Sequence, residues 1–494
     1  MFRLALVARA RRARWSVVLI LICTLFLLFA TDRTGYAAPP PGSEISSPEA
    51  AAGRRPNIVF LLTDDLRFDA LGFVQRSMNG AGRFPFIQNA TPNIDRIASE
   101  GVYFRNAFVT SSLCSPSRSA MLTGRYPHMT GVVDNRTAFP VESETYATLL
   151  REAGYRTGYF GKWHMAEQTA RPGFDQYASY VGQGVYFDAR FLVDGVATPT
   201  KGWVDDIATD YALSFIRINA RLGQPFVAVV GFKTPHGPLL NMAPARNANL
   251  FSDATLDTPI NARHKPPYFP DGAPSWFDTR QMQGYFRLLA GVDENVGRVL
   301  EVLDQENITR DTVVVFASDN GFHMTEHGSP RSNPVDGEKR SAYESSIHIP
   351  LLISHPGTIK PAMIRTAVLN IDLAPTFLGM AGLPPSPGMQ GKDLAPLLRG
   401  TATSVRSAFF YEYFEERGFV VPTIKAYRTN RYKLIEFPAN PEYGREFYDL
   451  VVDPWETRNI VDEPSMQSVV NSVKRDLDAS ALSLKYVVPT PKTR

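Results

Sequence analysis

From residue 56 onward the chain alternates continuous apolar runs with amphipathic stretches. Continuous apolar runs of this length are typical of strands buried on both faces of a sheet. Between them, Thr91 followed by Pro92 marks the start of a helix and Gly101 its end. The alternation predicts an α/β fold with a large, mostly parallel or mixed sheet between helices. We expect strands at residues 57–62, 155–160, 226–232, 312–317 and 349–354, and helices at 91–101 and 145–153.

The pattern changes after about residue 395. Residues 424–427 and 432–437 are two short apolar segments joined by Arg428-Thr-Asn-Arg431, which predicts an antiparallel hairpin. We therefore expect a main domain over residues 56–394 and a smaller α+β domain over residues 395–494. The aromatic cluster at residues 409–414 fits a buried strand of that smaller domain better than a surface for stacking sugars.

Polar side chains follow four of the expected strands directly. Open α/β sheets bind ligands at the edge where parallel strands end. Four polar clusters after buried strands therefore predict one shared site at that edge. The residues are Asp64 and Asp65, Lys162 and His164, His236, and Asp319 and Asn320.

The composition, 44% hydrophobic and 20% charged residues, is that of a globular chain of ordinary type. The net charge of +3 is unevenly distributed, because residues 1–38 carry six arginines against one aspartate. The rest of the chain is slightly acidic, so we expect no nucleic-acid partner.

The N-terminal 38 residues have the three parts of an export signal. A basic stretch ends at Arg14, an uncharged apolar run covers residues 15–31, and small residues precede Pro39. We expect cleavage, a linker rich in Pro and Ala at residues 39–55, and a secreted or periplasmic protein. An uncleaved anchor is the alternative, and a membrane is a partner only in that case.

Two cysteines are present, and Cys23 lies inside the expected signal. The mature chain would then keep only Cys114, which cannot form an intramolecular disulfide. A buried core cysteine is the ordinary explanation for a lone thiol. The residues that follow Cys114 favour a different one.

The segment Cys114-Ser-Pro116-Ser-Arg118, followed by Leu122-Thr-Gly124, resembles the signature of type I sulfatases, which belong to the alkaline phosphatase superfamily. The resemblance extends from Pro56 to Asn459. It implies an alkaline-phosphatase-like fold and hydrolysis of sulfate esters. In that family a maturation enzyme, here an expected partner, oxidises the cysteine to formylglycine. The aldehyde hydrate then supplies one oxygen that attacks sulfur and a second that expels sulfate.

The resemblance also implies a metal ion beside the modified Cys114. Its expected ligands are Asp64, Asp65, Asp319 and Asn320, whose oxygens suit a hard cation and not zinc. Calcium is the expected ion and magnesium the alternative. Such a cation lowers the pKa of a bound hydroxyl and offsets charge on sulfate oxygens.

Five further residues receive catalytic roles from the resemblance. Lys162 and His164, in Gly-Lys-Trp-His, are expected to stabilise charge and to assist sulfate release as a base. His236, in Thr-Pro-His, is expected to contact sulfate and the leaving group, and Lys339 to bind sulfate. Arg118 is expected to orient the nucleophile. Because Arg340 adjoins Lys339, either residue fits that position in the sequence.

Several alternatives remain open at this point. The motifs look most like those of carbohydrate sulfatases such as N-acetylglucosamine-6-sulfatase, which suggests a sulfated carbohydrate substrate. A phosphonate or phosphate ester hydrolase of the same superfamily would share the metal site. If Cys114 stays a thiol, the chain would be a non-catalytic glycan-binding protein. His323 and His327 follow the expected metal ligands, and could line the pocket or hold the loop.

Overall fold

The structure is a computed structural model that describes residues 55–79, 81–269, 277–328, 331–332, 335–336 and 339–488. The expected export signal and nearly all of the linker lie outside these residues. Residues 55–494 form one compact unit, and the expected division of that unit at residue 394 stays a prediction. Across the described ranges, no helix has the length and apolarity needed to cross a membrane.

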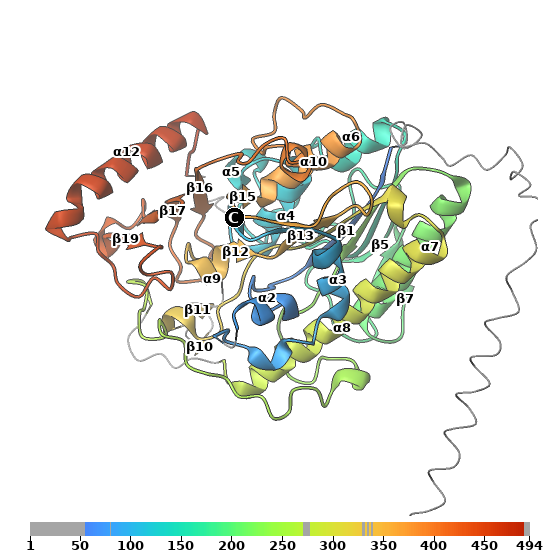
Figure 1. The fold of residues 1–494 in the computed structure, drawn as a ribbon, viewed down its shortest axis with the longest axis horizontal. Helices are drawn as coiled ribbons and strands as arrows, with labels where there is room; N and C mark the ends of the chain where they lie inside the picture. The colour runs from blue at the N-terminus through green and yellow to red at the C-terminus, as the bar shows by residue number, and fades with distance from the viewer. Residues whose placement is uncertain are drawn as a thin grey trace, which may run out of the picture. The chain divides into compact units, whose positions relative to one another are not determined.

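A ten-stranded mixed sheet forms the centre of the molecule (Figure 1). Its central strands β9, β1, β8, β4 and β5 are parallel, whereas β13, β6 and β7 run antiparallel to their neighbours. The expected mostly parallel or mixed sheet is therefore confirmed. In spatial order the strands are β14 (Ala362–Ile364), β2 (Gly101–Phe104), β13 (Leu351–Ser354), β9 (Thr312–Ser318), β1 (Asn57–Thr63), β8 (Phe226–Gly231), β4 (Arg156–Lys162), β5 (Gln176–Tyr180), β6 (Arg190–Val193) and β7 (Val196–Pro199).

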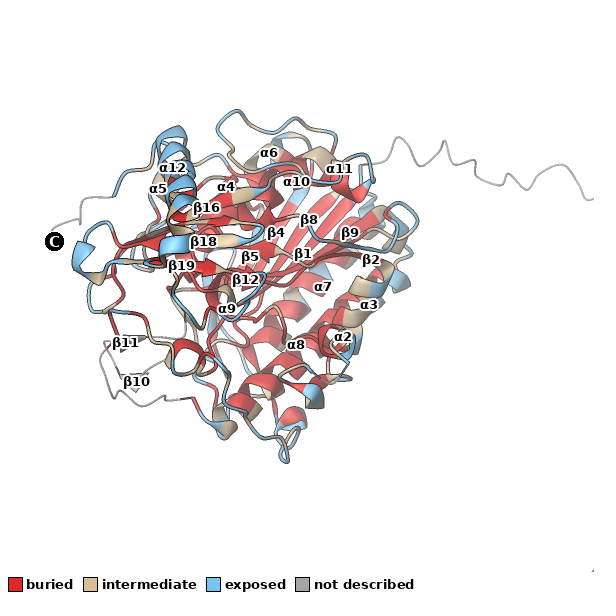
Figure 2. Cartoon of the chain, turned by 60° about the vertical axis from the view of Figure 1, so that its left-hand side comes forward, coloured by how far each residue is buried: buried red, intermediate tan, exposed pale blue. Residues whose placement is uncertain are grey.

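Helices cover both faces of this sheet, and strand β1 shows why. Its residues alternate between two apolar cores, with Ile58 and Phe60 in one and Val59 and Leu61 in the other. Figure 2 shows the strands buried between the two layers. One layer contains α4 (Cys114–Thr123), α6 (Tyr146–Glu152) and α10 (Leu373–Met380), and the other α3 (Pro92–Glu100), α7 (Val204–Leu222) and α8 (Thr279–Gln305).

The run expected to form one strand at residues 349–354 forms two. Strand β12 (His348–Ile349) pairs with β3 (Ala107–Phe108), which also pairs with β15 (Val368–Leu369) in a separate three-stranded sheet. Strand β13 then joins the large sheet. Pro350 stands between them, and because proline has no backbone N–H it interrupts the ladder there.

The C-terminal part contains a four-stranded antiparallel sheet. Its order is β16 (Ala408–Tyr413), β17 (Ile424–Thr429), β18 (Tyr432–Glu436) and β19 (Arg445–Asp449), and α12 (Gln467–Ser483) packs against it. The expected hairpin is confirmed as β17–β18. The aromatic side chains of β16 are buried, so they form core rather than a sugar-stacking surface.

The remaining elements are short. They comprise α2 (Gly72–Ser77), α5 (Pro127–Thr130), α9 (Glu344–Ile347), α11 (Ala395–Leu398) and the two-residue strands β10 (Arg331–Ser332) and β11 (Val335–Asp336).

Candidate active site

The polar clusters predicted from the sequence meet at one edge of the sheet. Strands β9, β1, β8 and β4 are adjacent and parallel, so the segments that follow them converge. Backbone hydrogen bonds tie these segments together, from Asp64 N to Thr234 O and from Asp319 N to Thr63 O, both at 3.1 Å. The structure thus brings together every residue that the sequence placed at the site, while their roles stay predictions.

Cys114 is the first residue of α4 and is completely buried. Its Sγ lies 3.7 Å from Asp64 Oδ1 and 3.1 Å from Lys339 Nζ. The next residue, Ser115, is held by a hydrogen bond from its backbone N–H to Asn135 Oδ1 at 3.0 Å. Burial raises the pKa of the Cys114 thiol to about 12. An unmodified thiol here would be uncharged at neutral pH and a poor nucleophile.

Asp64, Asp65 and Asp319 each direct a carboxylate oxygen to one point, with these oxygens within 4.8 Å of one another. Asp65 N donates to Asp319 Oδ1 at 3.1 Å, and Asn320 Nδ2 donates to Asp65 Oδ1 at 2.6 Å. The amide oxygen of Asn320 is buried and accepts no hydrogen bond from the described residues. Three buried carboxylates and an unsatisfied oxygen form a donor set that fits a hard divalent cation.

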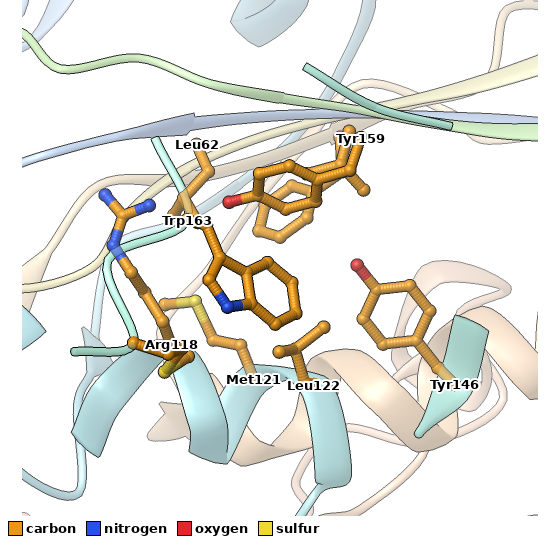
Figure 3. A pocket seen from close by; sticks show the side chains of 10 residues that line it. Leu62, Arg118, Met121, Leu122, Tyr146, Tyr159 and Trp163 are labelled. Carbon is orange, nitrogen blue, oxygen red and sulfur yellow. The ribbon is translucent and has the colours of Figure 1, made fainter. Parts of the chain in front are cut away.

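Arg118, in the second turn of α4, holds two of these carboxylates. Its Nε donates to Asp319 Oδ2 at 2.8 Å, and Nη2 lies 3.4 Å from Asp64 Oδ2. Its Nη1 also donates to the carbonyl oxygen of Lys162 at 2.8 Å. Beside it lies an apolar pocket with Trp163 and Met121 in its wall, from which the guanidinium points away (Figure 3). These contacts fit the orienting role expected for Arg118, which stays a prediction.

Two buried lysines contact the same carboxylates. Lys162 Nζ forms an ion pair with Asp64, and Lys339 Nζ donates to Asp65 Oδ1 at 2.6 Å. Burial alone would raise the pKa of Asp64, but Lys162 and the neighbouring cations hold it well below its usual range. Burial alone would lower the pKa of Lys339, but Asp65 and the neighbouring acids raise it well above its usual range. Lys339 therefore stays charged at neutral pH.

Of the two adjacent candidates, Lys339 enters the site and Arg340 does not. Arg340 Nε donates to Glu416 Oε2 at 2.7 Å, and its guanidinium lies 4.0 Å from the ring centroid of Phe419. Arg340 thus contacts the segment after β16, whereas Lys339 contacts Asp65.

Both predicted histidines are neutral at physiological pH. Burial, reinforced by the charge of Lys162, lowers the pKa of His164 and of His236 well below the usual range. His236 Nδ1 lies 2.7 Å from Gly237 O, and its Nε2 lies 3.8 Å from Asp65 Oδ2. Because a carbonyl oxygen can only accept, Nδ1 carries the proton and Nε2 is free to accept one.

His323 and His327 belong to a buried hydrogen-bonded cluster. His323 lies 2.7 Å from Ser345 Oγ and 2.9 Å from Ser341 Oγ, one contact for each ring nitrogen. The ring of His327 stacks on Tyr343 at 3.7 Å between centroids. Of the two roles considered for these histidines, holding the loop fits these contacts.

Lys233 and Gln183 lie beside these residues, but Lys233 was not predicted from the sequence and no role was predicted for Gln183. Gln183 Oε1 accepts a hydrogen bond from Lys162 Nζ at 2.5 Å, and Lys233 Nζ donates to Gln183 O at 3.0 Å. A signal for Lys233 was present, because it lies two residues after the end of β8. The segment Gly182-Gln-Gly184 resembles carbohydrate sulfatases, but the contacts of Gln183 depend on how the loop after β5 folds back.

The chain is similar to known proteins over most of its length. The sulfatase family model matches residues 56–383, and the model for the C-terminal part of N-sulphoglucosamine sulphohydrolase matches residues 337–482. The chain is 31% identical to an N-acetylglucosamine-6-O-sulfatase of Bacteroides thetaiotaomicron over 84% of each chain. It is 29% identical to an ulvan-active sulfatase of Formosa agariphila, covering 87% of this chain and 82% of that one.

Among solved structures, one similar chain was determined in complex with its substrate, D-glucosamine-2-N,6-O-disulfate. The TM-score is 0.77 at 28% identity, and the match covers 89% of this chain and 100% of the other. This likeness confirms the expected alkaline-phosphatase-like arrangement of a large sheet with a smaller C-terminal antiparallel sheet.

Proposed function

The chain belongs to the sulfatase family and is a sulfuric ester hydrolase, and on that premise we propose that it removes sulfate from a sulfated amino sugar. The observation that carries the proposal is the convergence of Cys114, three carboxylates and two lysines at one buried point. The relative named N-acetylglucosamine-6-O-sulfatase and the similar structure bound to a glucosamine disulfate support the substrate class.

We propose that Cys114 acts only after oxidation to formylglycine by a maturation enzyme. The motif Cys114-Ser-Pro116-Ser-Arg118 supports this step, as does the raised pKa of the buried thiol. When hydrated, the aldehyde supplies one hydroxyl oxygen as nucleophile toward sulfur and a second whose deprotonation expels sulfate. The N-terminal export signal supports action outside the cytoplasm.

We further propose a calcium ion held by Asp64, Asp65, Asp319 and Asn320, with magnesium as the alternative. The unsatisfied Asn320 oxygen and the all-oxygen donor set support this proposal. When bound, the ion lowers the pKa of the nucleophilic hydroxyl and offsets charge on the sulfate oxygens.

The remaining residues then have separate tasks. Lys162 and Lys339 offset negative charge as it develops around the sulfate, because contacts with Asp64 and Asp65 hold both side chains at the site. His236 passes to the leaving oxygen a proton that its Nε2 first accepts from the attacking hydroxyl, and His164 removes the proton of the second hydroxyl during sulfate release. Both imidazoles are neutral, so each can take up a proton before passing it on. Arg118 holds Asp64 and Asp319 in place.

Mass spectrometry and kinetics test the proposal together. In active enzyme, the peptide covering residues 106–125 should be about 18 Da lighter than the thiol form, because the aldehyde replaces the thiol. Active preparations that contain only the thiol would contradict the mechanism. Paired rates on an aryl sulfate and an aryl phosphonate separate the two ester classes, and a strong preference for phosphonate would contradict the sulfatase assignment. A protein that binds sulfated glycans but turns over neither ester would be the non-catalytic alternative.

A further inference from the structure

Lys233 is a buried lysine beside the catalytic residues that the mechanism above does not use. It lies just after β8, and its residue is 2% exposed. Its backbone N–H donates to Asp205 Oδ1 at 2.9 Å, which fixes the main chain at this position. Its Nζ donates to Gln183 O at 3.0 Å and lies 4.9 Å from the ring centroid of Tyr186.

The charge of Lys233 differs from that of the other two lysines at the site. Lys162 pairs with Asp64 and Lys339 with Asp65, but no carboxylate of the described residues lies within 4.0 Å of Lys233 Nζ. An ammonium group carries three donors, and the described residues supply Lys233 Nζ with one carbonyl and one aromatic face. Burial, followed by repulsion from Lys162, outweighs the attraction of Asp64 and Asp205 and lowers the pKa of Lys233 to about 8. Among the described residues, no carboxylate thus pairs directly with this charge.

A short loop holds Lys233 in this position. Gln183 stands between Gly182 and Gly184, whose φ angles of 62° and 64° lie in the left-handed region. A Cβ atom at Gly184 would lie 2.4 Å from the ring of Tyr180, so a side chain there would displace the loop. The carbonyl of Gln183 receives Lys233, and its side-chain oxygen receives Lys162. Both ammonium groups are thus fixed by one residue.

Tyr186 connects Lys233 with His236, the expected catalytic histidine. Tyr186, whose ring lies against the Lys233 ammonium, donates a hydrogen bond to the backbone carbonyl of His236. The side chain of His236 is 19% exposed, whereas those of Lys162 and Lys339 are at most 5% exposed. The site therefore opens toward solvent on the His236 side. Linked to His236 through Tyr186 on this side is Lys233, the one of these three lysines that pairs with no carboxylate of the described residues.

We propose that Lys233 is a substrate-binding residue that recognises an anionic group of the sulfated substrate and determines affinity more than chemical rate. The proposal rests on the sulfate-ester function proposed above. The anion is either the sulfate being transferred or a second charged group on the same sugar. In both cases it supplies the negative charge that the protein does not.

The test compares Lys233→Met with Lys233→Gln, which removes the charge but keeps a donor for Gln183 O. Lys201→Met is the matched control, because Lys201 is exposed just after β7. Steady-state kinetics are measured on an aryl sulfate, glucosamine 6-sulfate and its N-sulfated form. Calorimetry with inorganic sulfate measures binding independently of turnover. Circular dichroism identifies which variants are folded.

We expect both Lys233 variants to raise KM for the N-sulfated 6-sulfate by about tenfold, with kcat within about threefold of wild type. The Kd for inorganic sulfate rises by the same factor if Lys233 contacts the transferred sulfate, and stays within twofold if Lys233 contacts the second anion. An equal rise on all substrates assigns the contact to the transferred sulfate, and a larger rise on the disulfated sugar assigns it to the second anion. KM and Kd within twofold of wild type, or a loss confined to kcat, would overturn the proposal. Failure of wild type to hydrolyse any sulfate ester would instead refute the proposed function, while calorimetry would still decide the role of Lys233.

Discussion

Glu326 is a buried carboxylate a few residues after the candidate metal ligands of β9. Its Oε1 lies 2.8 Å from Arg67 Nη1 and also forms an ion pair with Arg83. Arg67 in turn donates to Phe322 O at 2.7 Å, in the segment that follows Asn320. Replacing Glu326 by Gln removes the charge while keeping the shape of the side chain. The substitution therefore tests whether the ion pairs of Glu326 with Arg67 and Arg83 stabilise the segment after Asn320.

The expected magnitude follows from the pKa of the carboxyl group. Burial alone would raise the pKa of Glu326, but Arg67 and Arg83 outweigh it and lower the pKa from 4.5 to about 2. That difference corresponds to roughly 3 kcal/mol of folding free energy. Because the folded-state pKa is lowered, this stability is present above pH 4.5 and is lost as pH falls toward 2. Breaking a buried ion pair by removing one partner costs a similar amount, about 3–5 kcal/mol.

Urea unfolding at two pH values measures this effect. At pH 7 we expect Glu326→Gln to lose roughly 3 kcal/mol, and at about pH 3.5 the difference from wild type should shrink to about 2 kcal/mol. Glu142→Gln, at an exposed position, is the control and should change stability at neither pH. A loss at pH 7 of less than about 1 kcal/mol, or an equal loss at both pH values, would refute the reasoning.

Three further predictions concern the metal, the loop after β5 and a buried histidine. Dialysis against a chelator should abolish aryl sulfatase activity, and calcium should restore it; activity that survives complete metal removal, checked by elemental analysis, would contradict the oxygen-ligand site. Gly184→Ala should raise KM and lower the free energy of unfolding by about 1–3 kcal/mol, because the new methyl group meets the ring of Tyr180. Gly223→Ala is the control, because Gly223 also has a positive φ but a Cβ there would have no neighbour within 4 Å. Calorimetric unfolding of the two variants therefore distinguishes the clash with Tyr180 from backbone strain alone. His128 contacts Glu412 Oε2 at 2.7 Å, and although burial alone lowers its pKa, this hydrogen bond raises it above 6.5. The stabilising effect of the pair is therefore present below pH 6.5 and is lost as pH rises through the folded-state pKa of His128. Between about pH 6 and pH 8.5, the melting temperature of His128→Gln should fall less than that of wild type. An equal fall in both proteins would contradict a stabilising pair between His128 and Glu412.

The sequence predicted where the site lies because its signals are local. Residues 58–62 of β1 are a continuous apolar run, and the charged residues begin directly after the strand, at Asp64. The same holds for β9 and Asp319. Once four such strands are assumed to be parallel, their ends must meet at one edge. Strand position, polar cluster and shared edge could therefore be predicted without any contact information.

Other features depend on long-range packing and could not be predicted in this way. The neighbours of β1 are β8 and β9, which lie far from it in sequence, so the pairing of Arg118 with Asp319 is invisible along the chain. The contacts of Gln183 depend on the path of a loop between two glycines. Pro350 did offer a local signal, as did Lys233 after β8, and Pro350 should have divided the strand expected at residues 349–354.

The charges around Cys114 come from distant parts of the chain that the fold brings together. The carboxylates of Asp64, Asp65 and Asp319 are offset by Arg118, Lys162 and Lys339, each in direct contact with one of them. This cluster is close to neutral, so a divalent cation bound there would give the site a positive charge. Lys233 would add to that charge without a carboxylate to cancel it. Affinity for a sulfate ester would then depend on the bound cation and all of these basic residues together, because Lys162 and Lys339 are each paired with a carboxylate.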